Sequence, residues 1–186
     1  MNTSYHNIHQ PIIDRCLQGD RTAHYEIYKL YSKAMYNTCL RITGNEMDAE
    51  DVLQESFVSA FKNLSSFKGS ASFGSWLKRI VVNNAINAVK KRRMNFESVD
   101  GKEDESAIAE PVEEANLSYD VGLVKEGISK LPEGYRLVLT LYLIEGYDHK
   151  EIGQILDITE STSKSQFNRS KKKLREILKE ELKYAG

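Results

Sequence analysis

Apolar residues recur along this chain at intervals of three and four positions, and no segment sustains the strict alternation of a half-buried β-strand. The clearest stripe lies between residues 46 and 65 and contains Val52, Leu53, Phe57, Phe61 and Leu64. Residues at this spacing share one face of a helix, and that face can pack against a core. The pattern therefore predicts helices over about 20–43, 46–65 and 75–93, and an all-α fold.

The first of these helices carries a signal at each end. Asp20 is a residue type preferred at helix N-caps, because its carboxylate can accept hydrogen bonds from free backbone N–H groups. Gly44 follows the last apolar position and can adopt the left-handed conformation that ends many helices. We therefore expect a helix that begins after Asp20 and ends at about Thr43.

The last third of the chain has the pattern of a helix-turn-helix motif. After helices over about 119–130 and 132–146, a short helix is expected to begin at Asp148, with Glu151 at the spacing of a capping box. A three-residue turn follows, and a long helix starts near Glu160. Gly153 costs about 0.5 to 1 kcal/mol inside the short helix relative to alanine, which indicates that another helix crosses close to it.

Charge is strongly polarised along the chain, although the formal net charge is only −1. Residues 78–96 contain six basic residues and no acid, whereas residues 97–120 contain nine acids and one lysine. The acidic stretch is also poor in apolar residues, so it cannot bury enough surface to offset the entropy of ordering. We therefore expect two small helical domains, 1–95 and 119–186, joined by a flexible acidic linker over 96–118.

The predicted helix 75–93 divides its residues between an apolar arc and a polar stripe. On a helical wheel the stripe consists of Arg79, Asn83, Asn87 and Lys90. Single-stranded nucleic acid requires cations for phosphate, amides for base edges and a ring for stacking, here Trp76. The other interpretation is a solvated surface with Trp76 in the core, and the wheel alone does not separate the two.

The long helix after the turn is the second basic element, with eight basic residues against three acids over residues 161–183. Its inward face consists of Ser163, Phe167, Ser170, Leu174 and Leu178. Its outward face consists of Ser161, Ser165, Asn168, Arg169 and Lys172. A recognition helix reads bases with the N-terminal part of its exposed face, so we favour binding of duplex DNA over a merely soluble basic helix.

Several classes of function find no support in the sequence. The apolar runs are much shorter than the roughly 20 residues that span a bilayer, and the N-terminus lacks an export signal. We therefore expect a cytoplasmic protein without membrane insertion. Cys16 and Cys39 are too few for a disulfide framework or a zinc site. The histidines are scattered and no glycine-rich phosphate loop occurs, so we expect no catalytic residues, no metal, no cofactor and no enzyme activity.

Two parts of the chain, about residues 20–93 and 119–180, resemble bacterial RNA polymerase sigma factors of the extracytoplasmic-function (ECF) group of the sigma-70 family. In region two of that family, the segment that binds the clamp helices of the polymerase's largest catalytic subunit is similar to "DAEDVLQESF". The segment that melts the minus-ten promoter element and holds the non-template strand is similar to "SFKGSASFGSWLKRIVVNNAINAVKKRR". Region four docks on the flap of the other large subunit and reads the minus-thirty-five element. It is similar to "LPEGYRLVLTLYLIEGYDHKEIGQILDITESTSKSQFNRSKKKLRE".

The resemblance implies three sets of contact residues. Core polymerase binding is implied for Asp48, Asp51, Gln54 and Glu55, where composition alone favours a solvated helix face. The loop from Phe67 to Gly74 corresponds to the segment that shapes a pocket for a flipped base. The candidate set for the minus-ten single strand is Phe67, Phe73, Trp76, Arg79, Asn83, Asn87 and Lys90. The candidate set for the minus-thirty-five element is Ser161, Thr162, Lys164, Ser165, Asn168, Arg169 and Lys172.

Two positions in the second domain depart from the family pattern. Gln166 stands where many members have arginine, and Ser163 stands where an apolar residue is usual. Both lie in the helix that reads the minus-thirty-five element, so the resemblance does not determine which base sequence this chain reads.

The partners that the resemblance implies are core RNA polymerase, promoter DNA and an anti-sigma factor. In related factors the linker threads the active-site cleft and RNA exit path of the polymerase, where the nine carboxylates of residues 97–120 could imitate phosphates. A disordered tether has nearly the same composition. Two other functions stay open from the residues alone: a stand-alone helix-turn-helix regulator of transcription, and a helical interaction protein whose basic segments serve solubility.

Overall fold

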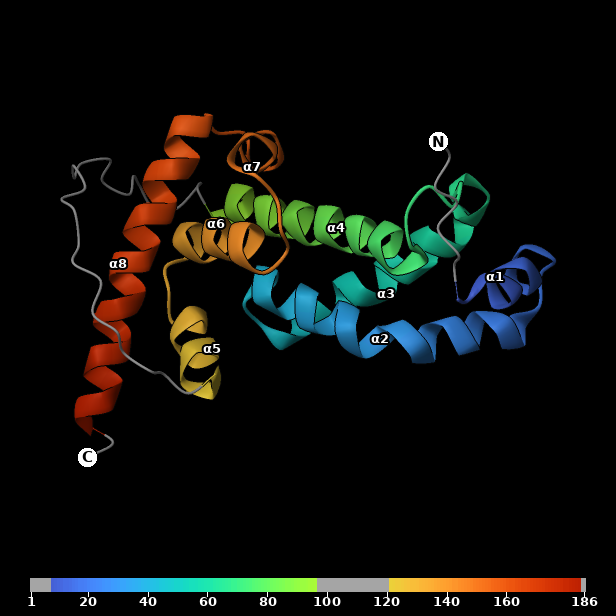
Figure 1. Ribbon diagram of the computed structural model, residues 1–186, viewed down its shortest axis with the longest axis horizontal. Helices are drawn as coiled ribbons and strands as arrows, with labels where there is room; N and C mark the ends of the chain where they lie inside the picture. The colour runs from blue at the N-terminus through green and yellow to red at the C-terminus, as the bar shows by residue number, and fades with distance from the viewer. Residues whose placement is uncertain (1–7, 97–120, 185–186) are drawn as a thin grey trace. The chain divides into compact units, whose positions relative to one another are not determined.

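The computed structural model describes residues 8–96 and 121–184 and divides into two units, Met1–Phe96 and Glu97–Gly186 (Figure 1). Within those described ranges the regular structure consists of α-helices and a 3-10 turn, and no strand occurs there. The predicted all-α fold with two helical domains is therefore confirmed. The acidic linker predicted over 96–118 lies, from residue 97 onward, outside the described residues.

The first unit is built on three long helices. Its elements are α1 (Gln10–Leu17), α2 (Arg21–Thr43), α3 (Glu46–Lys62), a 3-10 turn (Leu64–Ser66) and α4 (Phe73–Phe96). Helices α2, α3 and α4 each pack against the other two, and α1 packs against α2. The core contains the fully buried side chains of Ile27, Ile42, Phe73, Leu77, Val81 and Val82. The buried face of α4 is therefore the arc that the apolar pattern predicts.

The predicted limits of α2 are confirmed by its caps. The carboxylate of Asp20 accepts hydrogen bonds from the backbone N–H groups of Thr22 and Ala23, at 2.8 and 3.3 Å. Gly44 ends the helix in the left-handed conformation with φ of 78°. The side chain thus satisfies two of the N–H groups that a helix start leaves free.

Helix α3 is shorter than the predicted segment 46–65. At its end, the side-chain amide of Asn63 donates a hydrogen bond of 2.9 Å to the carbonyl of Ser59. Leu64, the last residue of the predicted apolar stripe, lies buried in the 3-10 turn that follows. It therefore reaches the core although the α-helix ends before it. Helix α4 begins at Phe73, two residues before the expected start, and α1 lies where the apolar pattern predicts no element.

The second unit contains α5 (Val121–Ser129), α6 (Glu133–Leu143), α7 (His149–Leu156) and α8 (Glu160–Tyr184). Helix α8 packs against each of the other three. One apolar cluster at its C-terminal half contains Ile128, Leu131, Leu139, Val124, Tyr135, Leu174 and Ile177. The capping box of α7 is confirmed: Asp148 accepts from the N–H of Glu151, and Glu151 accepts from the N–H of Asp148.

The turn between α7 and α8 explains Gly153, although not by the predicted helix crossing. A Cβ atom at Gly153 would lie 2.8 Å from the carbonyl oxygen of Ile158 and 3.5 Å from the nitrogen of Glu160. The close neighbour is therefore the backbone of the turn itself. Asp157 makes this tight turn possible by adopting the left-handed conformation, with φ of 59°.

Candidate nucleic-acid interface

The polar stripe predicted on α4 is confirmed as an exposed face. Arg79, Asn83, Asn87 and Lys90 are all exposed, whereas the opposite arc is buried at Leu77, Val81, Val82, Ala85 and Val89. The buried arc of α4 fixes the helix, so these four residues lie on its outer side. The face offers two amides between two cations on consecutive helical turns, and cations of this kind can contact the backbone of an unpaired strand.

Aromatic side chains gather at the start of α4, next to the polar stripe. The ring of Phe73 lies 5.4 Å, between centroids, from each of the rings of Tyr31, Phe67 and Trp76. Phe67 and Trp76 are partly exposed, so their rings can be reached by a base. Phe73 is completely buried.

Direct contact of Phe73 with the strand stays a prediction, and the burial of its ring argues against it. A buried ring at the centre of three aromatic contacts cannot reach a base without unpacking the core. Phe73 supports Phe67 and Trp76 from beneath. Gly74 lets this cluster close, because a Cβ atom there would lie 3.1 Å from the ring of Tyr31.

The third asparagine of α4, Asn84, has a different environment from Asn83 and Asn87. Its side-chain amide donates a hydrogen bond of 3.1 Å to the hydroxyl of the buried Ser56 on α3. This bond ties α4 to α3 and fixes the rotation of α4 about its axis. Asn84 thus positions the exposed stripe, a role that the sequence did not indicate.

The acidic face of α3 divides into exposed residues and one half-buried residue. Asp51, Gln54 and Glu55 are exposed. Asp48 is half-buried, and its carboxylate accepts hydrogen bonds of 2.6 Å from both Arg92 and Asn45. The predicted polymerase-binding set therefore contains three accessible side chains and one, Asp48, that is engaged within the fold.

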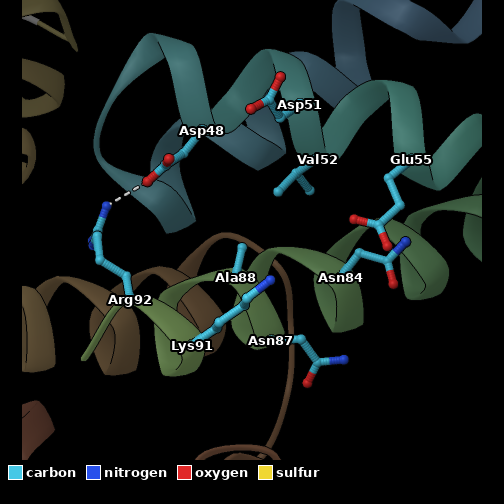
Figure 2. Close-up of a pocket in the computed structure, with 9 residues that line it drawn as sticks. All are labelled: Asp48, Asp51, Val52, Glu55, Asn84, Asn87, Ala88, Lys91 and Arg92. Atoms are coloured by element: carbon cyan, nitrogen blue, oxygen red, sulfur yellow. Dashed lines mark hydrogen bonds and ion pairs between the residues drawn. The ribbon is translucent and has the colours of Figure 1, made fainter. Parts of the chain in front are cut away.

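A groove of about 420 Å³ runs between α3 and α4 (Figure 2). Its lining residues are Asp48, Asp51, Val52, Glu55, Asn84, Asn87, Ala88, Lys91 and Arg92. In Figure 2 the carboxylates of Asp51 and Glu55 come from the α3 wall, and Asn87 and Lys91 come from the α4 wall. The groove thus brings members of the two predicted binding sets of this unit to one place.

Arg92 belongs to the basic residues of α4 but is half-buried and points toward α3. Its guanidinium donates to Asp48 and also to the backbone carbonyl of Thr43, the latter at 3.2 Å. The sequence contains a signal for this orientation of Arg92. Arg92 lies four residues after Ala88 and three after Val89, and both belong to the apolar arc of α4. Lys90 and Lys91, the two residues before Arg92, are exposed, as is Arg79 earlier in the helix.

Helix α8 exposes most of the residues that are predicted to read DNA. Ser161, Lys164, Ser165, Asn168 and Lys172 are exposed, and Thr162 and Arg169 are partly exposed. Ser163 and Ser170 are completely buried, as the wheel predicts. The outward and inward faces of α8 are therefore confirmed, including the short polar side chains in its first turns.

Two of the predicted DNA-reading residues on α8 also make contacts within the helix. The ammonium of Lys164 lies 2.6 Å from the carboxylate of Glu160, one turn earlier. The hydroxyl of Thr162 lies 2.8 Å from that of Thr159, which also accepts a hydrogen bond from the Thr162 N–H. Hydrogen bonding to Lys164 lowers the pKa of Glu160, so this carboxylate is ionised at neutral pH. Lys164 therefore has a counter-charge beside it.

His149 is the residue in the second unit that sequence reasoning missed. Its Nδ1 lies 3.0 Å from the hydroxyl of Ser163, and its ring stacks on that of Tyr142 with centroids 4.4 Å apart. The bond joins the two helices of the helix-turn-helix. Ser163, which departs from the family pattern, therefore has a partner for its buried hydroxyl.

Two further features concern metal binding and membrane crossing. Among the residues that the structure describes, no group of three or more histidine, cysteine or acidic side chains is arranged to hold a metal ion. Within the same ranges, no helix has the length and apolar character needed to cross a membrane.

Together, a helical bundle with an exposed face of amides and cations and a helix-turn-helix with a basic second helix are typical of a DNA-binding protein of the all-α class. Comparison with protein families gives the particular group. Residues 27–94 match the family model of Sigma-70 region 2, and residues 122–174 match that of Sigma-70, region 4. The chain belongs to the ECF group of sigma-70 RNA polymerase sigma factors, and the stand-alone regulator is not favoured.

Individual proteins support this assignment over nearly the whole chain. The ECF RNA polymerase sigma factor SigW of Bacillus subtilis (strain 168) is 32% identical over 178 residues, which cover 90% of this chain and 95% of that protein. The ECF RNA polymerase sigma-E factor of Salmonella typhi is 32% identical over 172 residues, or 87% of this chain and 90% of that one.

Solved structures agree in fold. The sigma factor RpoE from Bartonella quintana, solved in complex with the anti-sigma factor NepR, has a TM-score of 0.53 and 23% identity. The match covers 83% of this chain and 96% of that one. The structure of CnrH in complex with the cytosolic domain of CnrY has a TM-score of 0.50 and 20% identity, covering 90% of this chain and 95% of that one.

Proposed function

We propose that this sigma factor divides promoter recognition between α4, which holds the unpaired minus-ten strand, and α8, which reads the minus-thirty-five duplex. The observation that carries the proposal is the face of α4: Asn83 and Asn87 stand exposed between Arg79 and Lys90, on a helix whose opposite side is fully buried. Such a face is rigid and ready before DNA arrives, which reduces the ordering cost of binding.

At the minus-ten element, each type of side chain has its own task. Arg79 and Lys90 neutralise phosphates, the amides of Asn83 and Asn87 bond to base edges, and the partly exposed rings of Phe67 and Trp76 stack with bases. Base stacking contributes about 1 to 3 kcal/mol per base, which offsets part of the cost of unpairing. Phe73 acts indirectly, by supporting both rings.

At the minus-thirty-five element, the exposed side chains of α8 divide between bases and phosphates. Ser161, Ser165 and Asn168 lie where a recognition helix contacts base edges in the major groove. Arg169 suits a guanine, and Lys164 and Lys172 suit the flanking phosphates. Each neutralised phosphate contributes about 0.9 to the slope of log affinity against log salt concentration, so binding weakens steeply as salt rises.

Core polymerase is proposed to dock on the exposed acidic face of α3. Asp51 and Glu55 lie one helical turn apart at the rim of the α3–α4 groove, where a basic surface of the polymerase can approach them. Gln54 adds a neutral hydrogen-bonding group on the same helix. Asp48, at the edge of this face, is bound by Arg92 and Asn45 and supports the face from within the fold. The polymerase supplies the catalytic chemistry, so we assign no enzyme activity to this chain.

The remaining assignments concern the linker, the partner proteins and the compartment. We assign residues 1–95 to region two, 96–118 to a tether and 119–186 to region four. An anti-sigma factor is proposed as a regulator, because both fold neighbours described above were solved with a bound partner, in one case a named anti-sigma factor. Polymerase and chromosome share the cytoplasm, so the chain acts there.

Run-off transcription with core polymerase on a library of promoters tests the proposal. The chain should select a set of promoters that share two spaced elements, and initiation should require both protein and core enzyme. Replacing Asn83 and Asn87 with alanine should reduce initiation on duplex templates by about fivefold or more per residue. The same variants should bind core polymerase normally.

Two outcomes of that experiment would overturn the proposal. One is the absence of initiation at any start site although the protein is folded. The other is tight, sequence-specific binding of duplex DNA by the free protein, with no response to core polymerase, which is the behaviour of a stand-alone regulator. An Asp51→Lys, Glu55→Lys variant that still bound core enzyme normally would remove the α3 docking face from the proposal.

A further inference from the structure

The two helices of the helix-turn-helix are joined by a polar contact between His149 and Ser163. His149 is the first residue of α7, and Ser163 lies in the first turn of α8, 14 positions later. The two side-chain atoms are 3.0 Å apart, and the Ser163 hydroxyl has no access to solvent at all. A buried hydroxyl needs a hydrogen-bond partner, and His149 supplies one from the facing helix.

Aromatic contacts hold the imidazole in place. Its ring lies 13° from parallel to that of Tyr142 and 5.5 Å, between centroids, from that of Phe167. Tyr142 and Phe167 also contact each other at 4.5 Å, and Lys171 lies over the Phe167 ring at 4.8 Å. Because Tyr142 is on α6 and Phe167 on α8, His149 contacts side chains from both neighbouring helices of the unit.

A hydrogen bond constrains the two helices differently from an apolar contact. Apolar side chains stay in contact when one helix slides or rotates slightly against another, whereas a hydrogen bond requires its two atoms to keep both a short distance and an angle above about 120°. The His149–Ser163 bond therefore fixes the rotation of α8 about its own axis. Ser161 and Ser165 lie two positions to either side of Ser163, so their direction depends on that rotation.

We propose that His149, acting through Ser163, is a positioning residue that sets how the first turns of α8 enter the major groove. The proposal rests on the proposed function of α8 in reading the minus-thirty-five element. It gives His149 no contact with DNA. Loss of the His149–Ser163 bond should reduce discrimination between base sequences more than it reduces affinity for DNA. Phosphate contacts tolerate a small rotation of α8, and base contacts do not.

The experiment measures discrimination by the holoenzyme made with the full-length chain. Initiation is compared on a promoter whose minus-thirty-five element was selected from the library and on one with a single substituted base in that element. Ser163→Ala removes only the hydroxyl, and we expect the ratio of the two rates to fall about fivefold. His149→Ala should lower the ratio at least as much, and the double variant should lower it no further than His149→Ala.

Two further variants separate positioning from general stability. His149→Asn loses the ring stack but keeps an amide near the place of Nδ1, so it should restore most of the discrimination that His149→Ala loses. Gln154→Ala, at an exposed position of the same helix, should leave the ratio unchanged. All variants should initiate equally on a template with a pre-melted minus-ten element and no minus-thirty-five element.

The outcomes separate this inference from the proposed function. If the unaltered chain initiates from no promoter, the proposed function fails. If it initiates but Ser163→Ala keeps full discrimination, the positioning role of His149 is overturned. Effects of Ser163→Ala and His149→Ala that multiply fully in the double variant would also overturn it, because the two residues would then act independently.

Discussion

The guanidinium of Arg92 on α4 donates a hydrogen bond of 2.6 Å to the carboxylate of Asp48 on α3. The same guanidinium donates to the carbonyl of Thr43 at the end of α2, so one side chain joins all three long helices of the first unit. The bond also removes one cation from the basic run of α4 and one carboxylate from the acidic face of α3. Region two thus uses part of its charge to hold its own helices together.

Arg92→Ala is expected to destabilise the first unit. The side chains of Arg92 and Asp48 are 28% and 33% exposed, so solvent screens the pair and the expected loss is about 1 to 2 kcal/mol. Urea unfolding of the full chain, followed by circular dichroism, measures this loss. Lys91→Ala, at the exposed neighbouring position, should change stability by less than about 0.5 kcal/mol. Equal effects of the two substitutions would contradict the role of Arg92.

Gly153→Ala should destabilise the helix-turn-helix by about 1 to 3 kcal/mol, because the new Cβ atom would meet the backbone oxygen of Ile158 at 2.8 Å. Gly127→Ala on α5 is the matched control. There the new Cβ atom would lie 2.9 Å from the Leu174 side chain and 3.0 Å from that of Leu178, whose ends can move. Alanine also raises helix propensity by about 1 kcal/mol. Thermal unfolding should therefore show a clear loss for Gly153→Ala and a much smaller change for Gly127→Ala.

The features that were predicted from the sequence and those that were missed differ in how far apart along the chain the interacting residues lie. Asp20, Gly44 and the Asp148–Glu151 pair act on backbone groups within four residues, so local patterns indicate them. Periodicity likewise predicted the outward stripe of α4 and the two faces of α8. Arg92 and His149 act on partners 44 and 14 positions away, and only the packed helices bring those partners together. The burial of Phe73 was not predicted for the same reason, since depth within an aromatic cluster depends on three segments at once.

Acid should weaken the start of α2 through Asp20. A hydrogen bond from Arg15 lowers the pKa of Asp20 below its usual value, and the cap bonds from Thr22 and Ala23 act in the same direction. A lowered pKa in the folded state means that this stabilisation is complete above the unfolded pKa of about 3.9 and is lost as pH falls through the folded value.

The measurement is thermal unfolding of Asp20→Asn and the unaltered chain over a range of pH. Asparagine can still cap the helix but carries no charge for Arg15. The unaltered chain should be more stable at neutral pH, and the difference should shrink as pH falls below about 4. Asp20→Ala, which also loses the cap, should be less stable than Asp20→Asn throughout. A gap between Asp20→Asn and the unaltered chain that stayed constant with pH would contradict the ion pair as its source.

Glu160 places a negative charge on the part of α8 that is proposed to face DNA. Its carboxylate lies 2.6 Å from the ammonium of Lys164, and both side chains are about half exposed. When DNA approaches, Lys164 must exchange this carboxylate for a phosphate, while Glu160 is repelled by the same phosphates. Glu160→Gln should therefore raise the affinity of holoenzyme for promoters with a minus-thirty-five element by about two- to fivefold at low salt.

Titration of holoenzyme onto labelled promoter DNA at several salt concentrations measures this effect, which should shrink as salt rises because the charges are exposed. Glu126→Gln is the control, since it makes the same change in net charge on α5, where Glu126 pairs with Lys130. An equal gain from both substitutions would assign the effect to overall charge. A loss of affinity with Glu160→Gln would mean that Glu160 itself accepts a hydrogen bond from a base, as carboxylates do from cytosine.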